Sequence, residues 1–418
     1  MTRAHAKTLQ LAILATFTGD ANTAARAFDE YGERDWRRLG SWLDASGLAL
    51  YFLEEVRRLC LRAVIPCSVL EDLQNKQLAN CDRTEAMLEE FLRVNHAFFA
   101  TGLQFANLKG FTLAPEYCPT PSLRSQFDLD FWVVREDADR WKTVLSELGY
   151  ELVGISPASL EFSAGERQHA RIRELYQPAR RRLVEIHLHD NSEFEGSAIA
   201  SRVIGGLTVP VLTREGIFVQ QCAHLTKHIR SEWTRASWML ELRNAICAAS
   251  SDDALWCAVC ATSGRHAIDV GIAAATAAKV FGFAVPAELA HWSVAALPPT
   301  VARWIETFAV DVATAKFPGS KNYLLLEREL TSDSGSYAAQ RRRKLFPVRL
   351  PGAITVPQGL QHRLQSLPSH LRHFQSRLQF HLRESIRFVR AERAWRRSLD
   401  AINGEISRAA TVPSLGHQ

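Results

Sequence analysis

The sequence predicts an α+β fold, in which a mixed β-sheet core is flanked by a helical N-terminal region and a helical C-terminal region. Apolar residues recur at helical spacing up to residue 100, follow the period of strands between residues 101 and 212, and return to helical spacing from residue 213. The 418 residues are enough for two or three domains. We therefore expect a helical region at 1–100, a sheet core at 101–212, a helical domain at 213–330 and a basic extension at 331–418.

The composition is ordinary for a globular protein. Hydrophobic residues make up 47% of the chain and charged residues 23%. No apolar run reaches the roughly 18 residues of a transmembrane helix, so we expect no transmembrane segment. The eight cysteines follow no disulfide or zinc spacing, and Cys257 and Cys260 lie in an apolar segment where two buried thiols are expected. Reduced thiols favour a cytoplasmic location.

Helices are predicted at both ends of the chain. The segment 1–20 is interpreted as an amphipathic helix rather than a signal peptide, because its apolar part is short and contains Gln10 and Thr16. Further helices are predicted at 36–50, 51–64, 87–99, 217–229, 233–249, 252–262 and 270–281.

Strands are predicted in the central segment. They are expected at 103–108, 127–134, 150–155, 160–163, 169–176 and 182–189, with helices at 111–117 and 136–148. Along 182–189 the alternation places Glu185 and His187 on one face and Val184 and Ile186 on the other.

Two carboxylates stand out in the strand 127–134. Asp128 and Asp130 are two residues apart, so they point to the same face of a strand that is otherwise built for burial. Burying two ionised carboxylates without a partner is costly. A divalent cation relieves that cost, and Mg²⁺ prefers carboxylate oxygens. Such pairs also occur at strand ends in water, which is the alternative interpretation.

A third carboxylate, Glu185, strengthens the metal hypothesis. If its strand neighbours the strand of Asp128 and Asp130, the three carboxylates converge and are able to hold two metal ions. His187 shares the face of Glu185, where it acts either as a base near the metal or as a hydrogen-bonded structural residue.

Phosphate-binding groups are predicted beside the carboxylates. Lys109 and Gly110 end a strand before a short helix, where glycine allows close backbone approach and free N–H groups attract anions. Arg124 lies four residues before Asp128 and is suited to bidentate phosphate binding. The alternatives are a surface lysine and a solvated loop arginine.

These motifs together resemble the uncharacterised bacterial nucleotidyltransferase family of the polymerase-beta superfamily. The resemblance covers about residues 85–280 and rests on Lys109-Gly110, Arg124, Asp128, Asp130, Glu185, His187 and a helical segment with His224, Lys227, His228, Trp238 and Glu241. It implies that Asp128, Asp130 and Glu185 are the metal ligands. Two departures are present: Lys109-Gly110 replaces the superfamily's usual Gly-Ser, and Glu241 stands where the family usually has Asp.

The resemblance also implies a reaction. It predicts an Mg²⁺- or Mn²⁺-dependent transfer of a nucleoside monophosphate from an NTP, with ATP the expected nucleotide, to an unidentified acceptor. Natural-product peptides, saccharides and small molecules are the acceptor classes considered. One alternative is a toxin-like enzyme that modifies tRNA or protein, and another is an inactive nucleotide-binding protein.

Two further basic features are left open. His224 and His228 lie one helical turn apart, without the HExxH pattern of a zinc site, and with Lys227 they are predicted to contact the nucleotide or acceptor.

From residue 341 to 397 the chain has fourteen Lys or Arg and two acids, and 371–399 is predicted to be a basic amphipathic helix. Three roles are open for this helix. It binds a polyanion such as nucleic acid, or it packs on the protein with its basic face in solvent. The third is contact with an anionic membrane surface through Phe374, Leu378, Phe388 and Trp395.

Overall fold

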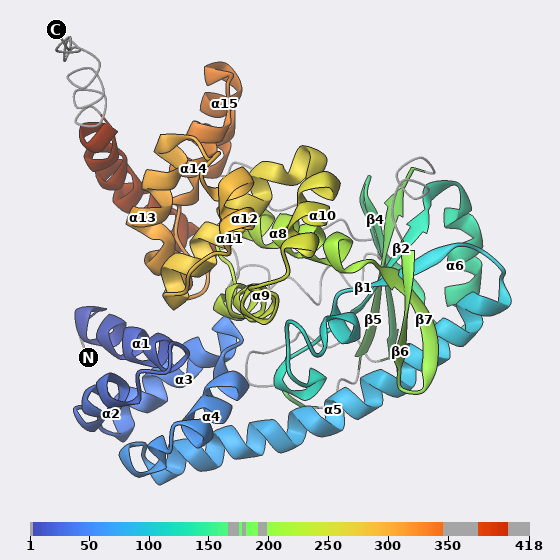
Figure 1. Ribbon diagram of the computed structural model, residues 1–418, viewed down its shortest axis with the longest axis horizontal. Coiled ribbons are helices and arrows are strands. Elements are labelled where there is room, and N and C mark those ends of the chain that lie inside the picture. The colour runs from blue at the N-terminus through green and yellow to red at the C-terminus, as the bar shows by residue number, and fades with distance from the viewer. Residues whose placement is uncertain (1–2, 166–174, 178–180, 191–198, 346–374, 400–418) are drawn as a thin grey trace, which may run out of the picture.

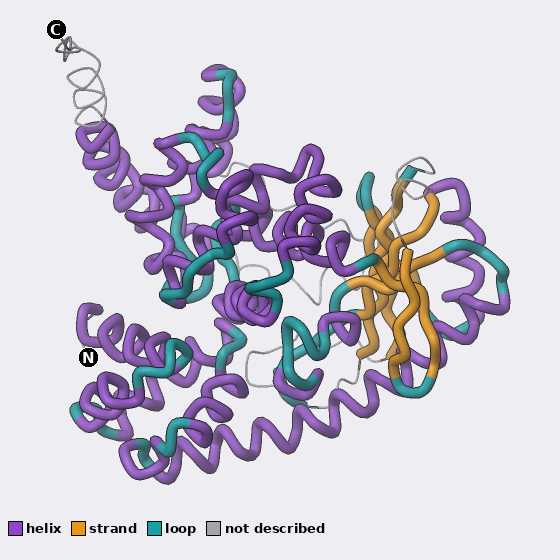
Figure 2. Tube along the Cα trace, in the orientation of Figure 1, coloured by secondary structure: helices purple, strands orange, loops and turns teal. Residues whose placement is uncertain are grey.

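The computed structural model describes residues 3–165, 175–177, 181–190, 199–345 and 375–399 (Figure 1). Among them, a seven-stranded sheet lies to one side of two groups of helices (Figure 2). One long helix, residues 67–100, runs from the N-terminal group of helices to the sheet. The predicted α+β class, with a mixed sheet between helical N-terminal and C-terminal regions, is confirmed. The four predicted domain boundaries stay predictions.

Helices fill the N-terminal region as predicted. They are α1 (Arg3–Thr16), α2 (Ala21–Asp29), α3 (Glu33–Ser46), α4 (Ala49–Arg58) and α5 (Cys67–Ala100). The helix α5 has 34 residues, far more than the predicted 87–99, and is therefore about 50 Å long. It carries the chain from the N-terminal helices to the sheet (Figure 1).

The sheet combines parallel and antiparallel strands. Its strands are β1 (Phe105–Leu108), β2 (Leu129–Val134), β3 (Glu151–Ile155), β4 (Ser159–Gly165), β5 (Arg181–His189), β6 (Ile199–Ile204) and β7 (Leu207–Leu212). They lie in the order β3-β4-β5-β2-β1-β7-β6. The pairs β2–β5 and β1–β7 are parallel and the others are antiparallel.

The hairpin of β6 and β7 was not predicted. Its two-residue turn consists of Gly205 and Gly206, which have φ angles of +57° and +83°. Glycine adopts such angles readily, and a Gly-Gly pair between two β-rich runs is a known hairpin signal. Of the predicted strand at 169–176, residues 169–174 lie outside the described residues, and Leu175 and Tyr176 form a turn instead of a strand.

The two faces of the sheet have different partners. Leu129, Phe131 and Val133 of β2 pack in a hydrophobic cluster with α5 and α6 (Ala138–Glu147). The alternate residues, Trp132 and Val134, belong to a larger cluster built mainly from the other helices. Asp130 therefore points to the face that the C-terminal helices cover, because alternate residues of a strand face opposite ways.

Helices return after β7, as predicted. They are α8 (Arg214–Ile229), α9 (Ala236–Ala248), α10 (Asp253–Ser263), α11 (Ala267–Phe281), α12 (Ala287–Leu289), α13 (Pro299–Ala313), α14 (Tyr323–Leu330) and α15 (Ser334–Leu345). The prediction of buried thiols at Cys257 and Cys260 is wrong, since both are exposed on α10. Trp256 and Val259 occupy the buried face of that helix instead.

A last helix is described over residues 375–399 and agrees with the predicted amphipathic helix, of which 371–374 lie outside the described residues. Its residues Phe388 and Trp395 are only 1% and 2% exposed. Trp395 packs on Phe308 of α13, with ring centroids 5.9 Å apart. These two aromatic side chains are therefore not available to a membrane surface. Within the described part of the chain, no helix combines the length and apolarity needed to cross a bilayer.

Candidate functional site

Neighbouring parallel strands bring two of the predicted carboxylates together. In the register of β2 and β5, Asp130 lies opposite Glu185 and Trp132 lies opposite His187. The strand pairing assumed from the sequence is thus confirmed. One ligand atom from each of Asp130, Glu185 and His187 lies within 4.8 Å of the other two, a spacing that suits a metal ion.

The third carboxylate, Asp128, lies just before β2, which begins at Leu129 rather than at the predicted residue 127. Its backbone carbonyl accepts a hydrogen bond of 3.0 Å from Nε2 of Gln126. A Cβ atom on Gly110 would lie only 2.2 Å from that same Nε2, and Gly110 has a φ of +51°. The glycine therefore makes room for the side chain that fixes the backbone at Asp128.

Lys109 is buried beside the carboxylates. Its Nζ donates to Oδ1 of Asp130 over 2.8 Å, and its backbone has a φ of +51°, which non-glycine residues rarely adopt. Burial opposes its charge, but the neighbouring carboxylates, Asp130 first, hold the pKa of Lys109 above its ordinary value. The helix that follows is a single 3-10 turn, Gly110–Leu113, instead of the predicted 111–117.

The electrostatics of the two aspartates differ sharply. Burial and the negative charge of Asp130 raise the pKa of Asp128 to about 6. Burial also opposes the charge of Asp130, but Lys109 and His187 hold the pKa of Asp130 well below its usual range. Nε2 of His187 lies 2.8 Å from Oδ1 of Asp130 and 3.6 Å from Oε2 of Glu185. The neighbouring positive groups therefore stabilise the ionised form of Asp130, but they do not offset the effect of burial on Asp128.

Arg124 is held by a buried glutamate. Its Nε donates to both carboxylate oxygens of Glu241, over 3.1 and 3.3 Å. The hydroxyl of Tyr51, from α4, donates to the same carboxylate over 3.0 Å. The terminal nitrogens of Arg124 make no hydrogen bond with any described residue. Glu241 therefore orients the arginine, a role that the sequence did not reveal, and Tyr51 gave no sequence signal at all.

The two predicted histidines of α8 form an aromatic cluster with Trp238 of α9. Ring centroids are 4.7 Å apart between His224 and His228, and 4.8 and 4.5 Å apart between each of them and Trp238. Burial, with a smaller contribution from Lys109, lowers the pKa of His224 to about 2 and that of His228 to about 4. Both rings are therefore neutral near pH 7. Lys227 is exposed on the same helix, and its positive charge also lowers the pKa of His228.

Two further arginines were missed by the sequence analysis. The guanidinium of Arg235 lies 5.2 Å from the ring centroid of Phe127 and 5.7 Å from that of Trp238. Arg83 of α5 lies 4.7 Å from the same Phe127 ring and donates to the backbone carbonyl of Gln126 over 2.9 Å. Arginine stacked on aromatic rings has no short sequence pattern, so only the fold brings these groups together.

The model of an uncharacterised nucleotidyltransferase family matches residues 32–277, which is more than half of the chain and contains all the site residues above. The chain belongs to this nucleotidyltransferase family. The family membership predicted from the motifs is thereby confirmed.

The other comparisons add little. No curated protein sequence matches the chain. Among solved structures, the chain is similar to an antigenic nucleotidyltransferase-like protein from Paracoccidioides brasiliensis, with 11% identity and a TM-score of 0.27 over 44% of this chain and 88% of that chain.

Proposed function

We propose that this member of the nucleotidyltransferase family transfers a nucleoside monophosphate from an NTP, with ATP the expected nucleotide, to an acceptor. The observation that supports the proposal most is the parallel pairing of β2 and β5, which sets Asp130 opposite Glu185 with Asp128 at the entry to β2. We assign these three carboxylates as the site's metal ligands, and we refer to them below as the carboxylate site.

The chemistry of the carboxylate site fits a divalent cation. The three carboxylates have one ammonium group, Lys109, and one imidazole, His187, as close polar neighbours. The pKa of about 6 at Asp128 reflects burial without enough positive charge, which a cation would supply. Oxygen ligands suit Mg²⁺, and an added imidazole is acceptable to Mn²⁺. When bound, such an ion neutralises charge that develops on the phosphates.

The side chains around the carboxylates have separate roles in the proposed reaction. The oxygen of an acceptor hydroxyl attacks the α-phosphorus and the hydroxyl proton passes to solvent. The bond from the α-phosphorus to the oxygen that bridges to the β-phosphate breaks, and pyrophosphate leaves. The terminal nitrogens of Arg124, which have no partner among the described residues, bind a phosphate bidentately, as the planar guanidinium favours. Lys109 and His187 position the carboxylate of Asp130, and Gly110 allows Gln126 to position Asp128.

The aromatic cluster supplies a surface for the nucleobase or the acceptor. Neutral His224 and His228 with Trp238 offer flat faces for stacking, and Arg235 adds a cation beside them. Lys227 is exposed on α8, the helix of His224 and His228, and we assign it to an outer contact with a phosphate.

The acceptor is the open part of the proposal. Natural-product peptides, saccharides and small molecules remain the acceptors we favour, and tRNA or protein modification is the alternative that keeps the same site. A catalytically inactive nucleotide-binding protein is disfavoured by the presence of all three carboxylates. Bacterial origin, cytoplasmic location and the four-segment domain division stay predictions of the sequence.

Nucleotide binding by the full chain tests the proposal. Isothermal titration with each NTP, with and without Mg²⁺, is expected to show metal-dependent binding that the Asp128→Asn/Asp130→Asn variant loses. The control is Asp139→Asn, because the side chain of Asp139 is 93% exposed on α6 and its ion pair is with the neighbouring Lys142. If the parent chain binds no NTP and releases no pyrophosphate from any, the proposed function is wrong.

A further inference from the structure

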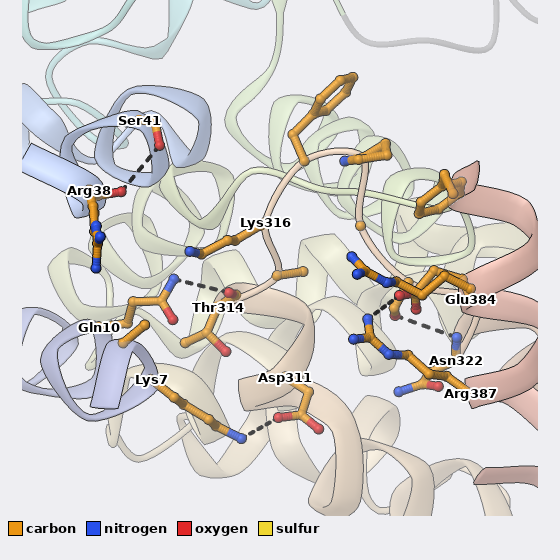
Figure 3. Close-up of a pocket in the computed structure, with 18 of the residues that line it drawn as sticks. Lys7, Gln10, Arg38, Ser41, Asp311, Thr314, Lys316, Asn322, Glu384 and Arg387 are labelled. Atoms are coloured by element: carbon orange, nitrogen blue, oxygen red, sulfur yellow. Dashed lines mark hydrogen bonds and ion pairs between the residues drawn. The ribbon is translucent and has the colours of Figure 1, made fainter. Parts of the chain in front are cut away.

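A large cavity lies away from the carboxylate site, between the N-terminal helices and the last helices of the chain. It has a volume of about 1380 Å³ and is lined by α1, α3, the segment after α13 and the helix at 375–399 (Figure 3). Six of its lining side chains are cationic and two are acidic: Lys7, Arg37, Arg38, Lys316, Arg383 and Arg387 against Asp311 and Glu384. We refer to it as the cationic cavity.

The two acids of the cationic cavity already have partners. Asp311 pairs with Lys7, and Glu384 pairs with Arg387 (Figure 3). Three other cations, Arg38, Lys316 and Arg383, form no ion pair with any described residue. They come from three different parts of the chain. Gathering like charges around one space costs free energy unless an anion joins them.

The size and lining of the cationic cavity indicate an extended ligand. Its volume exceeds the roughly 300–1,000 Å³ of sites for small molecules. Phe317 lines it and is 61% exposed, so a flat apolar ring stands among the cations. Single-stranded nucleic acid is bound in this way, with its phosphates on cations and a base stacked on an aromatic ring.

A second space, of only about 10 Å³, lies between the cationic cavity and His228. Ala315 and Ser320 line both cavities, and His228 lines the narrow one. The segment between α8 and α9 is fixed there, because Ser320 donates its backbone N–H to the carbonyl of Glu232 over 2.8 Å. The ring of Trp233 lies 5.4 Å from that of Phe317. The cationic cavity is thus separated from His228 by one short segment.

We propose that the cationic cavity binds the phosphate groups of an extended anionic ligand through Arg38, Lys316 and Arg383. This binding does not depend on the proposed function. A phosphodiester strand and a polyphosphorylated small molecule share this chemistry.

Fluorescence anisotropy with a labelled single-stranded RNA of twelve nucleotides tests the binding. We expect the triple variant Arg38→Glu/Lys316→Glu/Arg383→Glu to bind it roughly 100-fold more weakly than the parent chain. For three phosphate contacts, the affinity of the parent should fall with salt with a log–log slope of about 2. The matched control is Arg26→Glu/Arg62→Glu/Arg303→Glu, which makes the same charge change at exposed positions outside the cavity.

Each outcome decides something. Loss of RNA binding in the cavity variant alone supports a strand as the ligand. If tripolyphosphate binds with the same dependence on the three cations and RNA does not, the ligand is a small polyphosphorylated molecule. The inference is overturned if the parent binds neither probe, or if both triple variants bind alike. NTP binding by the parent is measured in parallel, so failure here is distinguishable from failure of the proposed function.

Discussion

The carboxylate site has an excess of negative groups, whereas the cationic cavity has an excess of positive groups. The carboxylate site lies on the sheet, with Asp130 buried and Asp128 and Glu185 half-buried. It has more negative than positive groups, and Asp130 contacts Lys109 and His187. The cationic cavity lies among helices, is open, and exposes cations without partners among the described residues. Buried groups that form hydrogen bonds or ion pairs with one another stabilise the fold and also bind a ligand. Exposed groups without such partners contribute to ligand binding but little to stability. Substitutions in the two regions should therefore differ in their effect on stability.

The largest stability effect is expected at Glu241. Glu241→Ala leaves the guanidinium of Arg124 buried without its carboxylate, which should lower the free energy of unfolding by about 3–5 kcal/mol. Urea denaturation measures it. Glu327→Ala is the control, since Glu327 is also buried and pairs with Arg230 rather than with Arg124. Both variants should lose stability, but only Glu241→Ala should weaken NTP binding; equal NTP binding in the two would contradict the role of Arg124.

Gly110→Ala should have the next effect. The new Cβ meets Gln126 and the backbone has a positive φ, so we expect a loss of about 2–3 kcal/mol in the free energy of unfolding. Gly149→Ala is the control, because Gly149 has a φ of +81° with no atom within 4 Å of the added Cβ. It should lose only the backbone part. If adding Gln126→Ala to Gly110→Ala recovers no stability, the steric account of Gly110 fails.

A smaller effect is expected from acid. The pKa values of His224 and His228 are lowered in the folded chain, so below pH 6.5 the unfolded chain binds more protons and stability falls as pH falls. Each histidine can contribute at most about 1.4 kcal/mol per pH unit. His228→Gln should reduce the slope of the unfolding free energy between pH 6.5 and pH 4.5. His224→Gln should also reduce it, and equal slopes in the parent and both variants would contradict the account.

The smallest effect is expected in the cationic cavity. Lys316→Ala removes an exposed cation that forms no ion pair with the residues the structure describes, so the free energy of unfolding should change by less than about 0.5 kcal/mol. Thermal denaturation at matched ionic strength measures it. A loss comparable to that of Gly110→Ala would show that Lys316 stabilises the fold, and the contrast between the two regions would disappear.

What the sequence predicted well was local. The alternation along β5 correctly placed Glu185 and His187 on one face, because the two-residue period of a strand needs no tertiary information. The neighbouring of β2 and β5 is not local, and the family resemblance rather than the periodicity made it predictable. The β6–β7 hairpin was missed although Gly205-Gly206 marks its turn.

Contacts between distant parts of the chain were beyond sequence reasoning. The hydroxyl of Tyr51 donates a hydrogen bond to Glu241, which lies 190 positions later in the sequence. No sequence pattern around either residue indicates this contact. The exposure of Cys257 and Cys260 was also mispredicted, since an apolar segment does not reveal which of its faces packs. The cationic cavity joins segments more than 300 residues apart, such as Arg38 and Arg383, so it appears only in the folded chain.

The most direct test of the carboxylate site is to locate the cation. Crystals grown with Mn²⁺ and a non-hydrolysable ATP analogue give an anomalous signal at each manganese position. We predict a peak bound by the carboxylates of Asp130 and Glu185, with Asp128 also within ligand distance. An ATP analogue bound elsewhere, or a manganese peak that touches none of these carboxylates, would contradict the central claim.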